Sequence, residues 1–334
     1  MQTFGLLLLM LIVILIAAEV FTNALEHLGE KLKISEGVTG SLFAAVGTAL
    51  PETMVPLLAI FAGTQNKHLN EEIGVGAILG APLMLSTLSI CIMALAVLKR
   101  RGLQGHLVPE RSGLTRDLNF FLLAFSLSCL ALFVPHDIPI MRVTLAIGMV
   151  LIYFVYIMLT LRASADLVKE GHATQAEEKM FLARFGLPQN MLVIVLQLLL
   201  GLAMLVGGAK GFISGVEEAS TILGISALML SLLIIPIATE LPEKVNSVLW
   251  IRRHKDTLAF GNITGAMVFQ GTLLPAIGIM LTPWVPQREV LAGIVITLIA
   301  ATWLRLMLAR GQLRVWHLAV NGGLYVTYLV TALA

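Results

Sequence analysis

Two short segments place a carboxylate beside a proline inside otherwise apolar sequence. The first, GTALPE, spans residues 47–52 within an apolar run from 38 to 63, and the second, ATELPE, spans residues 238–243. A carboxylate at membrane depth is costly and usually faces a cavity or a partner. Proline has no N–H, so the carbonyl four residues earlier loses its helical donor and remains close to the carboxylate. Grouped oxygen atoms of this kind suit Na⁺ or Ca²⁺.

These two segments belong to an internal duplication of the chain. Glu243 follows Glu52 by 191 residues, and the same offset relates the threonine and the proline of one segment to those of the other. A second pair of similar segments follows, GAILGA at residues 76–81 and GNITGA at residues 261–266, with an offset of 185. The sequence therefore predicts an interrupted apolar helix at the same place in each half of the chain.

The composition excludes a water-soluble globular protein. Of the 334 residues, 58% are hydrophobic and 13% are charged, and the mean hydropathy is +0.92, whereas about 25% of residues are charged in soluble domains. The two cysteines, Cys91 and Cys129, lie in apolar runs without the spacing of metal ligands. The first apolar run, from residue 4 onward, has no basic segment before it, which predicts a transmembrane helix rather than a cleavable signal.

Apolar runs long enough to cross a bilayer, which takes about 20 residues, occur ten times. They cover approximately residues 4–25, 38–63, 72–98, 118–135, 138–162, 190–214, 225–251, 258–281, 289–309 and 315–333. Five spans per repeat is an odd number, so the second repeat must enter the membrane in the opposite orientation. The predicted fold is an all-α membrane protein with ten transmembrane helices, built as two inverted five-helix repeats in which helices 2 and 7 are broken.

The predicted domains are a first transmembrane repeat (1–162), a cytoplasmic linker (163–189) and a second transmembrane repeat (190–334). The linker is the one long polar stretch, and we expect a short amphipathic helix in it. The loops after the odd-numbered spans hold 17 of the 22 Lys and Arg residues, and the alternate loops hold three. Because cytoplasmic loops collect positive charge, both termini are expected outside.

Motifs of nucleotide and metalloprotease chemistry are missing from the sequence. It contains no Walker motif, no glycine-rich nucleotide loop and no H-E-x-x-H. We therefore expect no cofactor, no nucleotide and no nucleic acid, and the expected partners are inorganic cations and the lipid bilayer. The sequence leaves the oligomeric state open.

The GTALPE segment resembles the G-T-S-L-P-E motif of the α-repeats in the cation/calcium exchanger superfamily, specifically of the sodium/calcium exchanger type. The ATELPE segment is similar to its second copy. Residues 76–81 and 261–266 lie where that family carries a G-N-x-x-G-S-N element. Together with ten spans, an inverted duplication and outside termini, the resemblance covers essentially the whole chain.

The resemblance implies an antiporter that binds cations near the membrane midplane, between the broken second and seventh helices and the third and eighth. In that family the two motif glutamates coordinate Ca²⁺ with the motif threonines and the carbonyls of the bend. Carried over to this chain, Glu52 and Glu243 are the central metal ligands, with Thr48 and Thr239 as their partners. Two carboxylates balance one divalent ion, and either can instead share Na⁺ or take a proton.

Several positions depart from the family pattern. The motif serine is Ala49 in the first copy and Glu240 in the second, and Pro82 and Met267 replace the Asn or Asp of the later element. Several oxygen ligands of the family's Na⁺ sites are therefore missing, while Glu240 is a further candidate metal ligand. Lys244 follows Glu240 by four residues, a spacing at which the two side chains can pair on a helix.

Lys244 suggests a hypothesis that the family motif does not supply. Its ammonium group could occupy the place of one transported Na⁺, which would reduce the number of Na⁺ ions per cycle or lead to exchange against protons. The alternative is that Glu240 and Lys244 neutralise one another outside the binding site. The sequence leaves both open.

Other functions compete with exchange of Ca²⁺ against Na⁺ or H⁺. The site could serve proton-coupled exchange of another divalent ion, Mg²⁺ or Mn²⁺, or the glutamates could act as acid and base in an intramembrane enzyme. Duplicated broken helices argue against the enzyme, because alternating access needs two gates and acid–base chemistry does not. A passive channel is disfavoured because paired carboxylates hold a divalent ion too tightly. The short linker leaves no room for a Ca²⁺-sensing domain, which favours a prokaryotic inner membrane.

Overall fold

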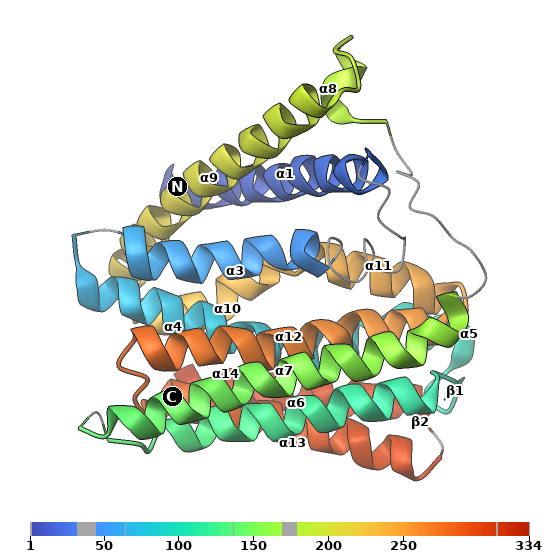
Figure 1. Ribbon diagram of the computed structural model, residues 1–334. Helices are drawn as coiled ribbons and strands as arrows, with labels where there is room; N and C mark the ends of the chain where they lie inside the picture. The colour runs from blue at the N-terminus through green and yellow to red at the C-terminus, as the bar shows by residue number, and fades with distance from the viewer. Residues whose placement is uncertain are drawn as a thin grey trace. The chain divides into compact units, whose positions relative to one another are not determined.

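The computed structural model describes residues 2–31, 45–63, 65–135, 137–168, 179–311 and 313–333. These residues are almost entirely helical (Figure 1). Within them, two strands of two residues each, β1 (His106–Leu107) and β2 (Leu313–Arg314), pair in antiparallel fashion. The predicted helical class is therefore confirmed.

The chain forms two compact units, each built from segments on both sides of the predicted linker. The smaller unit comprises Met1–Asn70 and Leu159–Gly224, and the larger comprises Glu71–Met158 and Ile225–Ala334. Helix α7 (Pro139–Val168) extends into the predicted linker, and the short helix α8 (Phe181–Arg184) lies near its end. Residues 169–178 of the linker lie outside the described residues. The division into two sequential repeats stays a prediction.

Close packing of two long helices dominates the smaller unit. Its helices are α1 (Gln2–Lys31), α3 (Ala45–Ala62), α8 and α9 (Met191–Leu223). Glycines of α9 lie against α1: a Cβ added to Gly201 would be 3.0 Å from the Cβ of Phe21, and one added to Gly208 would be 3.0 Å from Ile14. Small residues at such contacts let membrane helices approach closely.

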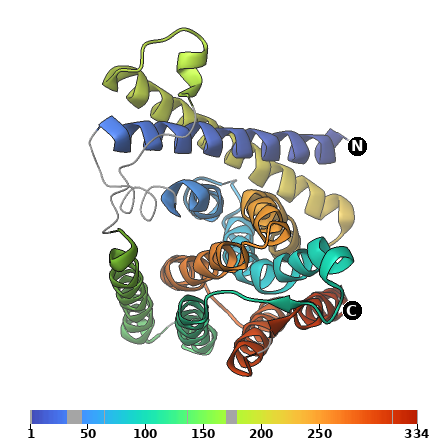
Figure 2. The same cartoon turned by 90° about the vertical axis from the view of Figure 1, so that its right-hand side faces the viewer.

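The larger unit contains the remaining helices, several of which are seen nearly end-on in Figure 2. They are α4 (Lys67–Met84, whose first turn belongs to the smaller unit), the π-helical turn η2 (Leu85–Ser89), α5 (Ile90–Arg101), α6 (Arg111–Ala131), most of α7, α10 (Ala227–Thr239), α11 (Leu241–Arg252), α12 (Asp256–Leu281), α13 (Arg288–Ala309) and α14 (Val315–Leu333). Helix α12 packs against α6 and α11, and α14 packs against α5 and α13.

A buried ion pair fixes the start of α12 against the end of α5. The guanidinium of Arg101 donates to both carboxylate oxygens of Asp256, over 2.9 and 2.8 Å, and also to the carbonyl of Ile251 over 2.6 Å. The backbone N–H of Val108 donates to the same carboxylate over 2.9 Å. Bidentate pairing of this kind fixes the relative orientation of the two side chains as well as the distance between them. It fixes the first turn of α12, the helix that carries the GNITGA segment (261–266).

The described residues include seven helices that are long and apolar enough to cross a membrane. They are Thr3–Phe21, Lys67–Arg101, Arg111–Ala131, Pro139–Thr160, Met191–Leu223, Asp256–Leu281 and Arg288–Ala309. The predicted spans 2 and 7 contain the two motifs and correspond to shorter apolar helices, Glu52–Ala62 and Ala227–Ile237. The charged groups of the second motif end the apolar stretch there, and residues 38–44 lie outside the described residues. The chain is an integral membrane protein, while the number of ten helices stays a prediction.

Candidate cation-binding site

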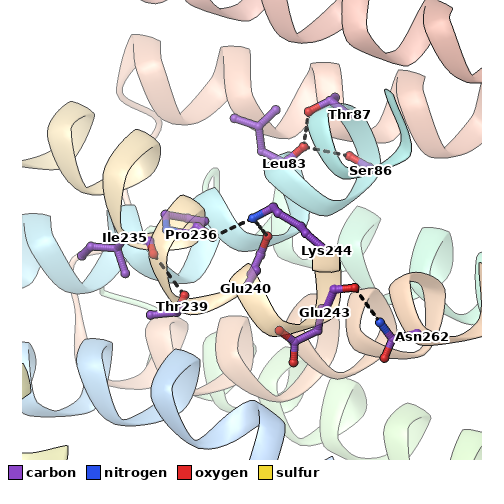
Figure 3. Close-up of polar contacts among 10 residues, drawn as sticks. All are labelled: Leu83, Ser86, Thr87, Ile235, Pro236, Thr239, Glu240, Glu243, Lys244 and Asn262. Atoms are coloured by element: carbon purple, nitrogen blue, oxygen red, sulfur yellow. Dashed lines mark hydrogen bonds and ion pairs between the residues drawn. The ribbon is translucent and has the colours of Figure 1, made fainter. Parts of the chain in front are cut away.

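The second motif interrupts its helix as predicted. Helix α10 ends at Thr239 and α11 begins at Leu241, with Glu240 between them at φ −90° and ψ 11° (Figure 3). Pro242 lies at the start of α11, where a missing N–H is tolerated. The carbonyl of Ala238 consequently has no N–H donor four residues later, as expected for a bend that presents backbone oxygen.

The first motif differs from the prediction. Helix α3 (Ala45–Ala62) continues through Pro51, so the described part of predicted helix 2 is not broken at this motif. A proline removes one hydrogen bond, but its φ is compatible with helix, so it need not end one. Glu52 is buried, with 4% of its surface exposed. The described side chains do not include that of Thr48.

Three ionisable side chains, two from the second motif and that of the adjoining Lys244, are buried at the helix break. Glu240 has no exposed surface, and Glu243 and Lys244 expose 4% and 9%. The ammonium nitrogen of Lys244 lies 3.0 Å from Oε2 of Glu240 and donates to the carbonyl of Pro236 over 2.9 Å (Figure 3). The predicted pairing of Glu240 with Lys244 is therefore confirmed. The backbone carbonyl of Pro236 is a second acceptor for the ammonium group, which the sequence did not indicate.

The second motif presents oxygen atoms that remain available to a cation. Oε1 of Glu240 and Oε2 of Glu243 are buried and have no hydrogen-bond partner among the described residues. The hydroxyl of Thr239, which is also buried, donates to the carbonyl of Ile235 over 3.1 Å. Because that bond uses the hydroxyl proton, the lone pairs of the oxygen are left to accept a ligand. Carboxylate and hydroxyl oxygens are hard ligands of the kind that Na⁺ and Ca²⁺ prefer.

Asn262 is a residue of this region that was not among the predicted ligands. From α12, its Nδ2 donates to the backbone carbonyl of Glu243 and to Oγ of Ser247, each over 2.9 Å (Figure 3). It thereby fixes the first turn of α11 against α12. The signal was present in the sequence, because Asn262 is one of the two polar residues of the GNITGA segment at 261–266, with Thr264.

Two further features of α12 concern its interior face. Met267 is buried and supplies no oxygen ligand, as expected from the departure at this position. Gln270, less than one turn later, is also fully buried, and neither its Oε1 nor its Nε2 has a partner among the described residues. A buried amide without partners is costly, and sequence reasoning gave no reason to select it.

Glycines of α4 bring that helix against the helix of the second motif. A Cβ added to Gly76 would lie 2.6 Å from the carbonyl oxygen of Leu228, and one added to Gly80 would collide with the carbonyl oxygen of Leu232. The backbones of α4 and α10 therefore meet without intervening side chains. Just beyond, η2 carries Ser86 and Thr87, whose hydroxyls donate to the carbonyl of Leu83 (Figure 3).

The structure thus groups three of the five predicted metal-binding residues, Thr239, Glu240 and Glu243, at one helix break of the larger unit. Glu52 is buried in α3 of the smaller unit. Among the residues whose side chains are described, no three His, Cys, Asp or Glu residues are grouped closely enough to hold a metal ion. The second motif contributes two buried carboxylates, those of Glu240 and Glu243.

Sequence comparison identifies relatives along nearly the whole chain. The profile of the family described as sodium/calcium exchanger protein matches residues 2–162 and 193–334. The chain is 24% identical over 321 residues to the putative antiporter CaxA of Alkalimonas amylolytica, which covers 91% of this chain and 89% of that protein. It is 25% identical over 281 residues to the inner membrane protein YrbG of Escherichia coli K12, covering 84% and 80%.

Solved structures share the fold. The H⁺/Ca²⁺ exchanger CAX superposes with a TM-score of 0.71 at 19% identity, covering 99% of this chain and 82% of that one. The sodium-calcium exchanger NCX_Mj superposes with a TM-score of 0.57 at 18% identity, covering 99% and 98%. The matched family and both structures are exchangers, not enzymes. From the family match over both halves, the chain belongs to the sodium/calcium exchanger protein family.

Proposed function

We propose that this protein is a secondary active antiporter that exchanges Ca²⁺ for Na⁺ or H⁺ by alternating access. The observation that carries the proposal is the repetition of the LPE motif with a buried glutamate in each copy, Glu52 and Glu243. The family match and the relatives named as antiporter and exchangers support it.

In the proposed mechanism, the two glutamates bind Ca²⁺, and Thr48 and Thr239 add hydroxyl oxygens. Glu240 contributes through its Oε1, because its Oε2 is engaged by Lys244. Two buried carboxylates cannot be left without compensating charge when Ca²⁺ leaves, since uncompensated charge at membrane depth is strongly disfavoured. Na⁺ or H⁺ must therefore replace Ca²⁺ before the carrier returns, and this requirement couples the two fluxes.

The architecture that we propose for this cycle is the predicted one. Ten transmembrane helices form two inverted five-helix repeats, residues 1–162 and 190–334, joined by the cytoplasmic linker 163–189. In such inverted repeats, alternating access proceeds by one bundle moving against the other around a fixed site. Both termini lie outside. The relative named as an inner membrane protein supports a prokaryotic plasma membrane as the location.

The proposal is tested by ⁴⁵Ca²⁺ uptake into proteoliposomes. Vesicles are loaded with Na⁺, or made acidic inside, and diluted into medium that contains ⁴⁵Ca²⁺. We expect uptake under at least one gradient, and loss of that uptake in both Glu52→Gln and Glu243→Gln. Glu218→Gln is the matched control, because it removes a carboxylate from α9 that lies outside both motifs and accepts a hydrogen bond from Thr3 over 2.8 Å.

The gradient that drives uptake identifies the coupling ion. Uptake driven by Na⁺ alone assigns sodium coupling, and uptake driven by the acidic interior alone assigns proton coupling. No ⁴⁵Ca²⁺ uptake under either gradient contradicts the proposal. In that case the same vesicles, tested with Mg²⁺ and Mn²⁺, show whether another divalent ion is the substrate.

A further inference from the structure

Lys244 is buried in a position that is unusual for a lysine. It is the one buried lysine among the described residues, and it lies next to Glu243 in the sequence and one turn beyond Glu240. Burying an ammonium group is costly unless other groups compensate its charge. Its two contacts, with the carboxylate of Glu240 and the carbonyl of Pro236, supply that compensation.

The Lys244 ammonium contacts two oxygen atoms of types that also bind a monovalent cation. One ligand is a carboxylate oxygen at 3.0 Å and the other is a helix carbonyl oxygen at 2.9 Å. The Pro236 carbonyl also accepts from the backbone N–H of Glu240 over 3.2 Å, so it points toward the helix break. Figure 3 shows the lysine side chain extending back from α11 to the end of α10 to reach both oxygens.

A comparison of the charges of the two motifs also indicates that Lys244 takes the place of a cation. Positions 191 residues earlier than Glu240 and Lys244 are Ala49 and Thr53, which carry no charge. Since Lys244 neutralises Glu240, Glu243 is the remaining charge of the second motif, as Glu52 is of the first. Without the ammonium, and with no Ca²⁺ bound, the second motif would hold two buried negative charges and would need one more monovalent cation than it needs with the ammonium.

We propose that the Lys244 ammonium is a tethered substitute for a monovalent cation, so that this exchanger binds one fewer Na⁺ at its second motif. This inference rests on the proposed function as an exchanger. It differs from a purely structural ion pair, because the place that Lys244 fills is one from which a free cation is released when Ca²⁺ binds.

The test counts the Na⁺ ions bound by the purified protein. Equilibrium binding of ²²Na⁺ is measured for the wild type, Lys244→Met and the double variant Glu240→Gln/Lys244→Met, at constant ionic strength with N-methylglucamine chloride. We expect Lys244→Met to bind one more Na⁺ than the wild type, and Ca²⁺ to displace it. The double variant should bind the same number as the wild type, because it has lost the uncompensated carboxylate together with the ammonium.

A second variant covers the case in which Lys244→Met does not fold. Lys244→Gln retains an N–H donor near the Pro236 carbonyl but has no charge, so it should also gain one Na⁺. An unchanged count in whichever of these variants folds would overturn the proposal. An additional Na⁺ that Ca²⁺ does not displace would identify a purely structural pair and would also overturn it.

This experiment separates the inference from the proposed function. ²²Na⁺ binding does not require Ca²⁺ uptake by proteoliposomes. A gain of one displaceable Na⁺ in Lys244→Met supports the tethered cation even if the wild type transports a divalent ion other than Ca²⁺. Uptake of ⁴⁵Ca²⁺ by the wild type with no gain of Na⁺ in the variant supports the exchanger and overturns the role of Lys244.

Discussion

The two LPE motifs have the same residues at their centre but different local structures. In the first, α3 runs through the motif as one helix and Glu52 is its charged residue. In the second, the helix is interrupted at Glu240, and the break holds an ion pair between Glu240 and Lys244 beside Glu243. The positions of that ion pair are occupied by Ala49 and Thr53 in the first motif.

The comparison shows that two copies of a duplicated motif can differ in local structure while they carry the same net charge. Glu240 alone would add a buried negative charge, and Lys244 alone would cancel Glu243. Together they leave one net negative charge per motif, and in our proposal the ammonium group lies beside the carboxylate where a mobile cation would otherwise bind. Equal charge with unequal structure is the relation that the following predictions test.

Removing the charge common to both motifs has the largest expected effect. Glu52→Gln and Glu243→Gln should each weaken Ca²⁺ binding on the order of a thousandfold, because two unit charges about 4 Å apart interact by roughly 4 kcal/mol at an effective dielectric constant of about 20. The measurement is the Ca²⁺ concentration that raises the melting temperature of the purified protein. Glu218→Gln should match the wild type. A large loss of Ca²⁺ affinity in one of the two glutamate variants, with no loss in the other, would contradict the proposal that both glutamates bind Ca²⁺.

Lys244→Met should destabilise the protein by about 3–5 kcal/mol, because it leaves the carboxylate of Glu240 buried without its partner. The measurement is the free energy of unfolding in detergent without Na⁺. The double variant Glu240→Gln/Lys244→Met should recover most of the loss, since neither charge remains. Thr53→Met, the corresponding change in the first motif, removes no charge and should cost less. Equal losses for Lys244→Met and Thr53→Met would contradict this account of the ion pair.

The glycines of the two later segments should also respond differently. Gly76→Ala brings a Cβ to 2.6 Å from the Leu228 carbonyl oxygen, and overpacking of this kind costs about 1–3 kcal/mol. Gly261, which corresponds to Gly76 in the duplication, has no atom within 4 Å of such a Cβ. Gly261→Ala should therefore stabilise its helix by roughly 0.5–1 kcal/mol. Thermal unfolding of both variants measures the two signs, and a gain in stability for Gly76→Ala would show that α4 and α10 are not in contact there.

Asn262→Ala should have a smaller effect, a loss of about 1–2 kcal/mol, because it removes two hydrogen bonds that are each worth about 1 kcal/mol. It should also weaken Ca²⁺ binding, since the turn that carries Glu243 is no longer fixed against α12. Asn262→Asp is the informative partner variant, as it keeps the side-chain size but has no N–H to donate. Wild-type stability and Ca²⁺ affinity in both variants would remove Asn262 from the site.

The features that the sequence predicted depend on local chemistry. Helical class and membrane location follow from composition. The break at Glu240 was predicted from Pro242, which lacks an N–H, although the corresponding Pro51 does not interrupt α3. The pair of Glu240 with Lys244 follows from their spacing of four residues. Each of these can be read within one turn or one apolar run.

The features that the sequence did not predict depend on contacts between distant segments. The presence of Pro51 led to the prediction of a broken helix, whereas α3 continues through this residue. Whether a helix ends or bends at a proline depends on what packs around it. The contacts of Asn262 join helices α11 and α12, and those of Gly76 join α4 and α10. Each of the two compact units combines segments from both halves of the chain. The hydropathy of the sequence does not predict this arrangement.

The most direct test of the relation between the motifs is ⁴⁵Ca²⁺ uptake by the double variant Glu240→Ala/Lys244→Thr, which gives the second motif the residues of the first. We predict uptake within about tenfold of wild type, because losing one oxygen of a neutralised pair costs on the order of 1 kcal/mol. Glu240→Ala alone should abolish uptake, since the Lys244 ammonium then cancels the charge of Glu243. A double variant as inactive as Glu240→Ala would contradict the account and make Glu240 itself an indispensable ligand.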